Sequence, residues 1–177
     1  SKAGFKGSPD PLGGRGFLKM MTGKEDIELK PVLLNGTYAI MKSYTKPYAS
    51  CRYTHPSVEA AIYLRNQYGL KAQDIECINI RTYSLAVAGH DHTEISGSYS
   101  AKMSIPYSTA AGLIFGKAGL QEFSEEMVKN SEILKLAKKV HVTADQELSD
   151  AFPGIQAAIV DINANGQHYS KRADFPK

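Results

Sequence analysis

A short segment of the chain, residues 46–56, concentrates side chains that can take part in proton transfer. Its sequence, KPYASCRYTHP, contains Lys46, Cys51 and His55. A lysine ahead of a proline has an extended backbone, and its ammonium group can bind a carboxylate or act as an acid. Lys46 can equally be a solvated surface lysine, so residue type and position leave both interpretations open.

Cys51 and His55 also have one chemical and one structural interpretation each. A thiol close to basic residues and to a helix N-terminus is favoured as a thiolate, which makes Cys51 a candidate nucleophile or base. His55 precedes Pro56 at the expected start of a helix, where the helix dipole favours a neutral imidazole that polarises a carbonyl or moves a proton. The alternatives are a small buried cysteine and a histidine that only caps the helix.

Two further segments carry polar side chains that could bind a ligand. His90 and His92 lie in the loop sequence GHDHTE, where two imidazoles and two carboxylates could hold a metal. A third ligand at a defined spacing is lacking, which favours solvated histidines and no metal site. In SAKMSIPYS, Lys102 and Ser104 precede an expected helix N-terminus, whose backbone N–H groups form a natural carboxylate site. Capping of that helix is the simpler interpretation of Ser104.

Length and composition limit the classes of protein to which the chain can belong. Its 177 residues suit one domain with a real core, or one domain and a short appendage. The formal net charge of +3 is spread along the chain and does not indicate nucleic-acid binding. No apolar run has the length of a membrane span, and no signal pattern is present. The two cysteines lack a CxxC motif, which does not indicate a zinc site; they could form one disulfide, but the composition favours reduced thiols in a cytoplasmic protein.

The hydrophobic pattern predicts the elements that must position these side chains. Residues 1–36 begin with a run of glycine and proline and continue without a clean period, which predicts a connecting segment. Residues 37–177 predict an α+β domain, with helices on one face of a mixed or antiparallel sheet. The expected strands are 37–46, 75–88, 140–144 and a hairpin around Asn165-Gly166, and the expected helices begin near Pro56, Pro106, Ser124 and Ser131.

Three blocks of the sequence together resemble the MmgE/PrpD family: KPYASCRYTHPSVEAA, SGSYSAKMSIPYSTAAGLIFG and the closing GQHYSKRADFPK. They occur in the family's order and span nearly the whole chain. The family includes 2-methylcitrate dehydratase, cis-aconitate decarboxylase and iminodisuccinate epimerase. The resemblance implies that residues 37–177 form the smaller α+β lid domain and that residues 1–36 connect it to a large helical domain. It also implies that the chain is a fragment of a longer enzyme.

The same resemblance implies roles for individual residues. Lys46 matches the lid lysine of the family, which is expected to stabilise negative charge or act as an acid. Cys51 stands where several members carry a histidine, so it departs from the pattern; together with His55 it is expected to handle the proton. Further residues are expected to bind the substrate: Arg52 as a carboxylate clamp, Tyr48 by orienting it, and Lys102 and Ser104 as its neighbours.

The resemblance implies a cofactor-independent lyase or isomerase that moves a proton next to a carboxylate of a small di- or tricarboxylate. The active site would lie between the lid and the helical domain. The fragment alone is therefore expected to be inactive and to expose an apolar patch beside Lys46 and Cys51. No metal is implied, and a homodimer is the common assembly. Two alternatives are a non-catalytic module that binds small acids or a partner protein, and a metal-dependent hydrolase that uses His90 and His92.

Overall fold

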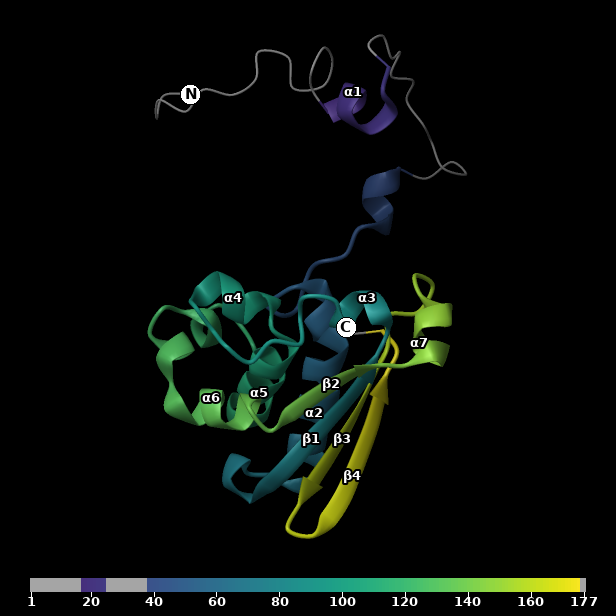
Figure 1. Cartoon of the computed structure of the whole chain (residues 1–177). Coiled ribbons are helices and arrows are strands. Elements are labelled where there is room, and N and C mark those ends of the chain that lie inside the picture. The colour runs from purple at the N-terminus through teal and green to yellow at the C-terminus, as the bar shows by residue number, and fades with distance from the viewer. Residues whose placement is uncertain (1–16, 25–37, 176–177) are drawn as a thin grey trace. The chain divides into compact units, whose positions relative to one another are not determined.

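The computed structural model describes residues 17–24 and 38–175 and divides the chain into two compact units, 1–44 and 45–177 (Figure 1). In the first unit, the described residues form helix α1 (Phe17–Thr22) and a 3-10 turn (Ala39–Lys42). Residues 1–16 and 25–36 of the predicted connecting segment lie outside the described residues. None of the helices described has the length and apolar character needed to cross a bilayer.

The strand predicted over residues 37–46 is wrong. Its described part contains the 3-10 turn instead, in which Ser43 N–H donates to the Ile40 carbonyl at 3.1 Å. Aromatic and β-branched residues favour a strand only where a neighbouring strand can pair with them. Among the described residues this segment has no such neighbour, and Tyr38 and Ile40 are exposed.

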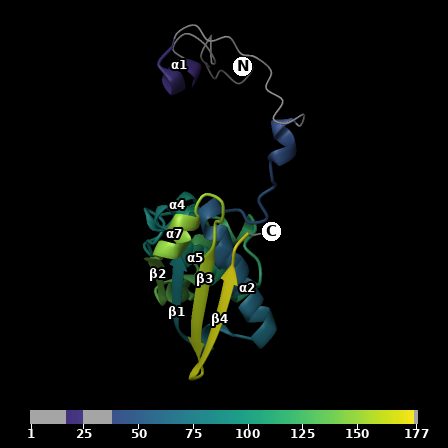
Figure 2. The same ribbon diagram turned by 90° about the vertical axis from the view of Figure 1, so that its right-hand side faces the viewer.

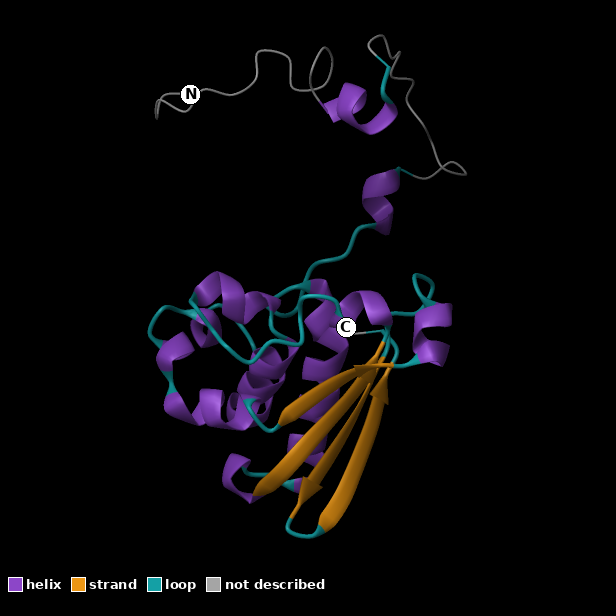
Figure 3. Ribbon diagram, viewed as in Figure 1, coloured by secondary structure: helices purple, strands orange, loops and turns teal. Residues whose placement is uncertain are grey.

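In the second unit, the described residues form one four-stranded sheet with strand order β2-β1-β3-β4 (Figure 3). β1 pairs in parallel with β2 and antiparallel with β3, and β3 pairs antiparallel with β4. The predicted α+β fold with a mixed sheet is therefore confirmed. The strands are β1 (Ile75–Thr82), β2 (Val140–Ala144), β3 (Ala158–Ala164) and β4 (Gln167–Ala173).

One face of this sheet is packed against helices, because apolar side chains alternate with polar ones along the central strands. Ile78 and Ile80 of β1 are fully buried beside Val160 and Ile162 of β3. Helix α2 (His55–Tyr68) packs on β3 and β4, and α5 (Ile105–Phe115) packs on β2. Figure 2 shows α2 alongside β4. The opposite face of the sheet carries mostly polar residues.

Helices α2 and α5 begin and end where their sequences predict. Each has a proline in its first turn, and the glycine that follows each has a left-handed backbone: Gly69 with φ of +66° and Gly116 with φ of +68°. The two helices approach closely because α5 carries Gly112 at the contact. A Cβ atom there would lie 3.2 Å from Cγ1 of Ile62.

Several boundaries differ from the prediction. The strand predicted over 75–88 stops at Thr82 and is followed by α3 (Ser84–Val87), and part of a predicted loop forms α4 (Ser98–Met103). The helix predicted from Ser124 is wrong: a 3-10 helix (Met127–Lys129) follows instead, and Met127 N–H donates to the Ser124 hydroxyl at 3.3 Å. Asn130 rather than Ser131 caps α6 (Ser131–Ala137). The hairpin is confirmed, with positive φ at both Asn165 and Gly166. Helix α7 (Gln146–Ala151) completes the described helices.

Candidate active site

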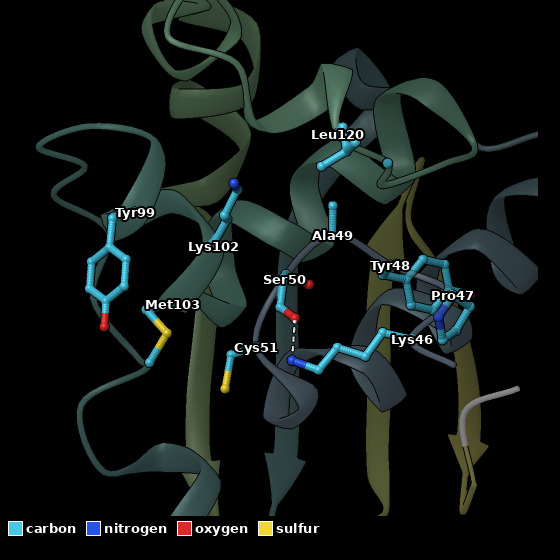
Figure 4. Close-up of a pocket in the computed structure, with 11 residues that line it drawn as sticks. Lys46, Pro47, Tyr48, Ala49, Ser50, Cys51, Tyr99, Lys102, Met103 and Leu120 are labelled. Carbon is cyan, nitrogen blue, oxygen red and sulfur yellow. Dashed lines mark hydrogen bonds between the residues drawn. The ribbon is translucent and has the colours of Figure 1, made fainter. Parts of the chain in front are cut away.

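The segment that precedes α2 lines a cavity of about 630 Å³ (Figure 4). Residues 46–51 contribute one part of the lining. Three side chains of α4 contribute another part, and Gly119 and Leu120, which follow α5, complete it. Three segments far apart in the sequence therefore meet around one open space. The residues from α4 are Tyr99, Lys102 and Met103.

Backbone hydrogen bonds hold these segments together. Cys51 N–H donates to the Lys102 carbonyl at 2.8 Å, and Ala49 N–H donates to the Ala118 carbonyl at 3.0 Å. The turn after α5 is fixed by the buried carboxylate of Glu122, which accepts a hydrogen bond from Gly119 N–H at 2.8 Å. The cavity lining is thus built on paired backbone groups, which position its side chains.

Two lysines give the cavity its charge. Lys46 is exposed, and its ammonium group donates to the Ser50 carbonyl at 3.4 Å. Lys102 is half-buried and reaches the cavity from α4. Within residues 38–175, no carboxylate forms an ion pair with either lysine. Two ammonium groups at one cavity create a positive potential that suits a carboxylate ligand.

Cys51 faces a histidine that is distant in sequence. The Cys51 sulfur lies 3.6 Å from Nε2 of His90, and Nδ1 of His90 lies 2.9 Å from the Ala88 carbonyl oxygen. Only 8% of His90 is exposed, and the Tyr53 ring packs edge-on against it with centroids 5.2 Å apart. The expectation of a solvated His90 is wrong, because the loop folds back and places this side chain against Cys51.

His55 is fully buried and does not line the cavity. Its Nε2 donates to the Ser50 carbonyl at 3.2 Å, and its Nδ1 accepts from the Arg52 guanidinium at 3.4 Å. Burial, together with the positive charges of Arg52 and Lys46, lowers the pKa of His55 to about 4. The ring is therefore neutral near pH 7. The Ser50 carbonyl accepts hydrogen bonds from both Lys46 and His55, so the two side chains meet at one point.

The predicted substrate-binding residues divide into two groups. Tyr48 and Lys102 line the cavity, whereas Arg52 and Ser104 do not. Burial and the nearby Glu59 carboxylate raise the pKa of Tyr48. Ser104 is fully buried, and its hydroxyl caps α5 by accepting from Tyr107 N–H at 3.1 Å.

The two loop histidines do not converge. Nε2 of His92 lies 3.2 Å from both the carbonyl and the hydroxyl oxygen of Ser100, whereas His90 faces Cys51. In the part of the chain that the structure describes, no three histidine, cysteine or carboxylate side chains are grouped so that they could hold a metal ion. Nothing in the described geometry favours the metal-dependent hydrolase.

Sequence reasoning misses several residues in or next to the cavity lining. The sequence presents His90 only as a metal candidate, because its contact with Cys51 spans 39 positions. Tyr99 and Leu120 are each 78% exposed, and with Met103 they form an apolar rim beside the lysines. Their position could not be inferred from residue type, since an exposed apolar side chain is ordinary by itself.

The fold and the cavity define a small α+β domain that carries an open, positively charged site with an apolar rim. A family model described as the MmgE/PrpD C-terminal domain matches residues 48–177. The chain therefore belongs to the MmgE/PrpD family and comprises its C-terminal domain; Lys46 lies just before the matched range. A search of curated proteins found no match.

Proposed function

We propose that this domain is the lid of a cofactor-independent lyase or isomerase, a dehydratase, decarboxylase or epimerase. Its substrate would be a small di- or tricarboxylate, and the reaction would move a proton next to a carboxylate. The observation that carries the proposal is the cavity itself, which combines the Lys46 and Lys102 ammonium groups with the Cys51 thiol. Membership of the MmgE/PrpD family supports it.

The proposed chemistry follows from charge. Loss of a proton from carbon next to a carboxylate leaves negative charge on the substrate, and positioned ammonium groups stabilise this charge most strongly where water is excluded. Lys46 and Lys102 supply that stabilisation, and Lys46 can also act as an acid. Cys51 is the proton-handling group that lines the cavity. Tyr48, also in the lining, orients the substrate.

For the remaining predicted residues we propose indirect roles. His55 is buried behind the cavity segment, and it shares the Ser50 carbonyl with Lys46. It therefore holds the segment in place, and Arg52 acts with it through the contact to Nδ1. Ser104 acts as the cap that starts α5 directly after α4.

The open cavity favours a second wall supplied by another domain. Tyr99 and Leu120 would be covered by such a wall, since exposed apolar side chains at the rim of a site commonly mark an interface. We propose that a helical domain of the same polypeptide provides it, with residues 1–36 as the connection and a homodimer as the assembly. The isolated domain would then be inactive. Both cysteines are free thiols, which suits a cytoplasmic enzyme.

The test is an activity assay of the full-length polypeptide against a panel of di- and tricarboxylates. Lys46→Ala should lower kcat/KM by about 100-fold, the usual cost of removing one group that stabilises transition-state charge. Lys129→Ala, an exposed lysine outside the cavity, is the matched control and should leave kcat/KM unchanged. Parental turnover in Lys46→Ala would refute the role of Lys46. Binding of the acids without turnover would favour a non-catalytic module.

A further inference from the structure

We infer that Cys51 and His90 form a proton-transfer pair, in which Cys51 is the catalytic base and His90 is the positioning residue that activates it. The identity of the substrate rests on the proposed function, whereas the existence of the pair does not. The inference is carried by the contact between the two side chains, by the hydrogen bond on the far side of the imidazole, and by the cavity that Cys51 lines.

The hydrogen bond to Ala88 fixes the tautomer of His90. A backbone carbonyl only accepts hydrogen bonds, so Nδ1 of His90 must carry the proton that it donates to Ala88 at 2.9 Å. In the neutral ring, Nε2 then has a free lone pair, and it lies 3.6 Å from the Cys51 sulfur. This is the arrangement in which an imidazole accepts a thiol proton.

The backbone holds His90 rigidly in this position. Its N–H donates to the Val87 carbonyl at 3.0 Å, and its own carbonyl accepts from Ile105 N–H at 2.8 Å, at the start of α5. Cys51 is held in turn by its hydrogen bond to the Lys102 carbonyl. Both members of the pair are therefore fixed by main-chain contacts, and little conformational entropy is lost when they meet.

The surroundings favour separation of charge between sulfur and ring. Lys46 and Lys102 line the same cavity as Cys51, and their positive charge stabilises a thiolate. Three tyrosines also lie near the pair among the described residues: Tyr53 packs against the ring of His90, and Tyr48 and Tyr99 line the cavity. Asp91, the next residue in the loop, is exposed.

The Cys51 S–H bond breaks and its proton moves to Nε2 of His90, which leaves a thiolate beside an imidazolium. The thiolate then takes a proton from the substrate: the C–H bond breaks, an S–H bond forms, and the electron pair stays on the substrate next to the carboxylate. The thiol returns that proton to the substrate carbon, or to a hydroxide that leaves as water. The thiolate and imidazolium are then restored.

The pair can be tested without a substrate, by measuring the rate at which iodoacetamide alkylates each cysteine as a function of pH, with peptide mass spectrometry to separate the two sites. Cys77 is the internal control. It is also half-buried, but its sulfur accepts a hydrogen bond from the Asn163 amide at 3.2 Å and contacts no histidine within the described residues. Each rate is divided by that cysteine's own rate in alkaline solution, which removes differences in accessibility.

The expected result is a difference in pH profile. About two pH units below the ordinary pKa of a thiol, a cysteine without a histidine partner (an unassisted cysteine) keeps roughly 1% of its alkaline rate of alkylation. Cys51 should keep at least about ten times that fraction, whereas Cys77 should behave as unassisted. His90→Asn keeps a donor for the Ala88 carbonyl but removes Nε2, and it should bring Cys51 down to the Cys77 profile. His92→Gln is the matched control and should leave Cys51 unchanged. Identical Cys51 profiles in the parent chain and His90→Asn would overturn the pair.

A second measurement covers the case in which His90→Asn does not fold. The ultraviolet absorbance of a thiolate in mildly acidic solution should be present in the parent chain and absent in Cys51→Ser. Its absence from the parent chain would overturn the pair. The result is separable from the proposed function: a confirmed pair with no turnover of any carboxylate by the full-length polypeptide would count against the function alone. Full turnover in Cys51→Ala would count against the base assignment alone.

Discussion

The cavity and the outer face of the sheet, which is the face opposite the helices, both carry basic residues. Within the described residues, those of the outer face form ion pairs with carboxylates and the two cavity lysines do not. There, Arg81 lies 3.5 Å from Asp145 and 3.7 Å from Asp161, and His168 lies 3.6 Å from Asp161. Arg172 likewise contacts carboxylates from α7 and from the end of β4. In the cavity, Lys46 instead donates to a backbone carbonyl.

This difference in ion pairing indicates where an anion can bind. Paired charges on the outer face cancel at short range, and solvent screens what remains. Within the described residues, no carboxylate forms an ion pair with Lys46 or Lys102, so their positive charge stays available for a ligand. The comparison therefore predicts that equal changes of charge at the two places will have unequal effects.

The largest expected effect is on anion binding. Lys46→Ala combined with Lys102→Ala should weaken the binding of citrate, used as a tricarboxylate probe, by about 100-fold. Each hydrogen-bonded ion contact is worth about 1.5 kcal/mol, or roughly tenfold in Kd. Arg81→Ala combined with Arg172→Ala removes the same net charge and should change Kd by less than about threefold. Isothermal titration calorimetry at low salt makes the measurement. Equal weakening by both pairs of substitutions would show that only total charge matters.

A second effect concerns the stability of the cavity segment at acidic pH. The pKa of His55 is about 4 in the folded chain, below the ordinary value of roughly 6.5, so the unfolded chain binds more protons between these values. The free energy of unfolding should therefore fall as pH drops from about 6.5 to 4, by up to roughly 3 kcal/mol. Urea unfolding at the two ends of this window measures it.

The matched variant for this effect is His55→Gln, which keeps a donor for the Ser50 carbonyl but cannot titrate. The variant should lose less stability than the parent chain over the same window, since other acidic groups contribute equally to both. If the two chains lose stability in parallel, His55 is not the group responsible, and the positive cavity does not hold a neutral histidine beneath it.

The smallest expected effect is on the outer face. Asp161→Asn removes the carboxylate shared by Arg81 and His168 and should lower the free energy of unfolding by less than about 1 kcal/mol. Both basic partners are exposed to solvent, and Arg81 keeps its contact with Asp145. Thermal or urea unfolding at low and high salt is sufficient to measure the change. A loss above about 2 kcal/mol would show that this network stabilises the fold rather than merely balancing charge.

Local signals in the sequence were sufficient for the elements that end in proline, glycine or a tight turn. The start and end of α2 and the hairpin at Asn165-Gly166 were predictable, because each depends on residues adjacent in the chain. The strand predicted over 37–46 was wrong because strand formation depends on a partner that the sequence does not reveal.

The sequence by itself determined that basic and thiol-bearing residues lead into α2 and that their chemistry suits acidic ligands. Only the tertiary structure decided which of them share a cavity. Cys51 meets His90 and Lys102 because the loop after α3 and helix α4 fold against the segment before α2. His55, in the same short segment, is buried instead. The spacing of residues along the chain determines the directions of their side chains only within one helix or strand. Contacts between helices and strands depend on how the whole core packs.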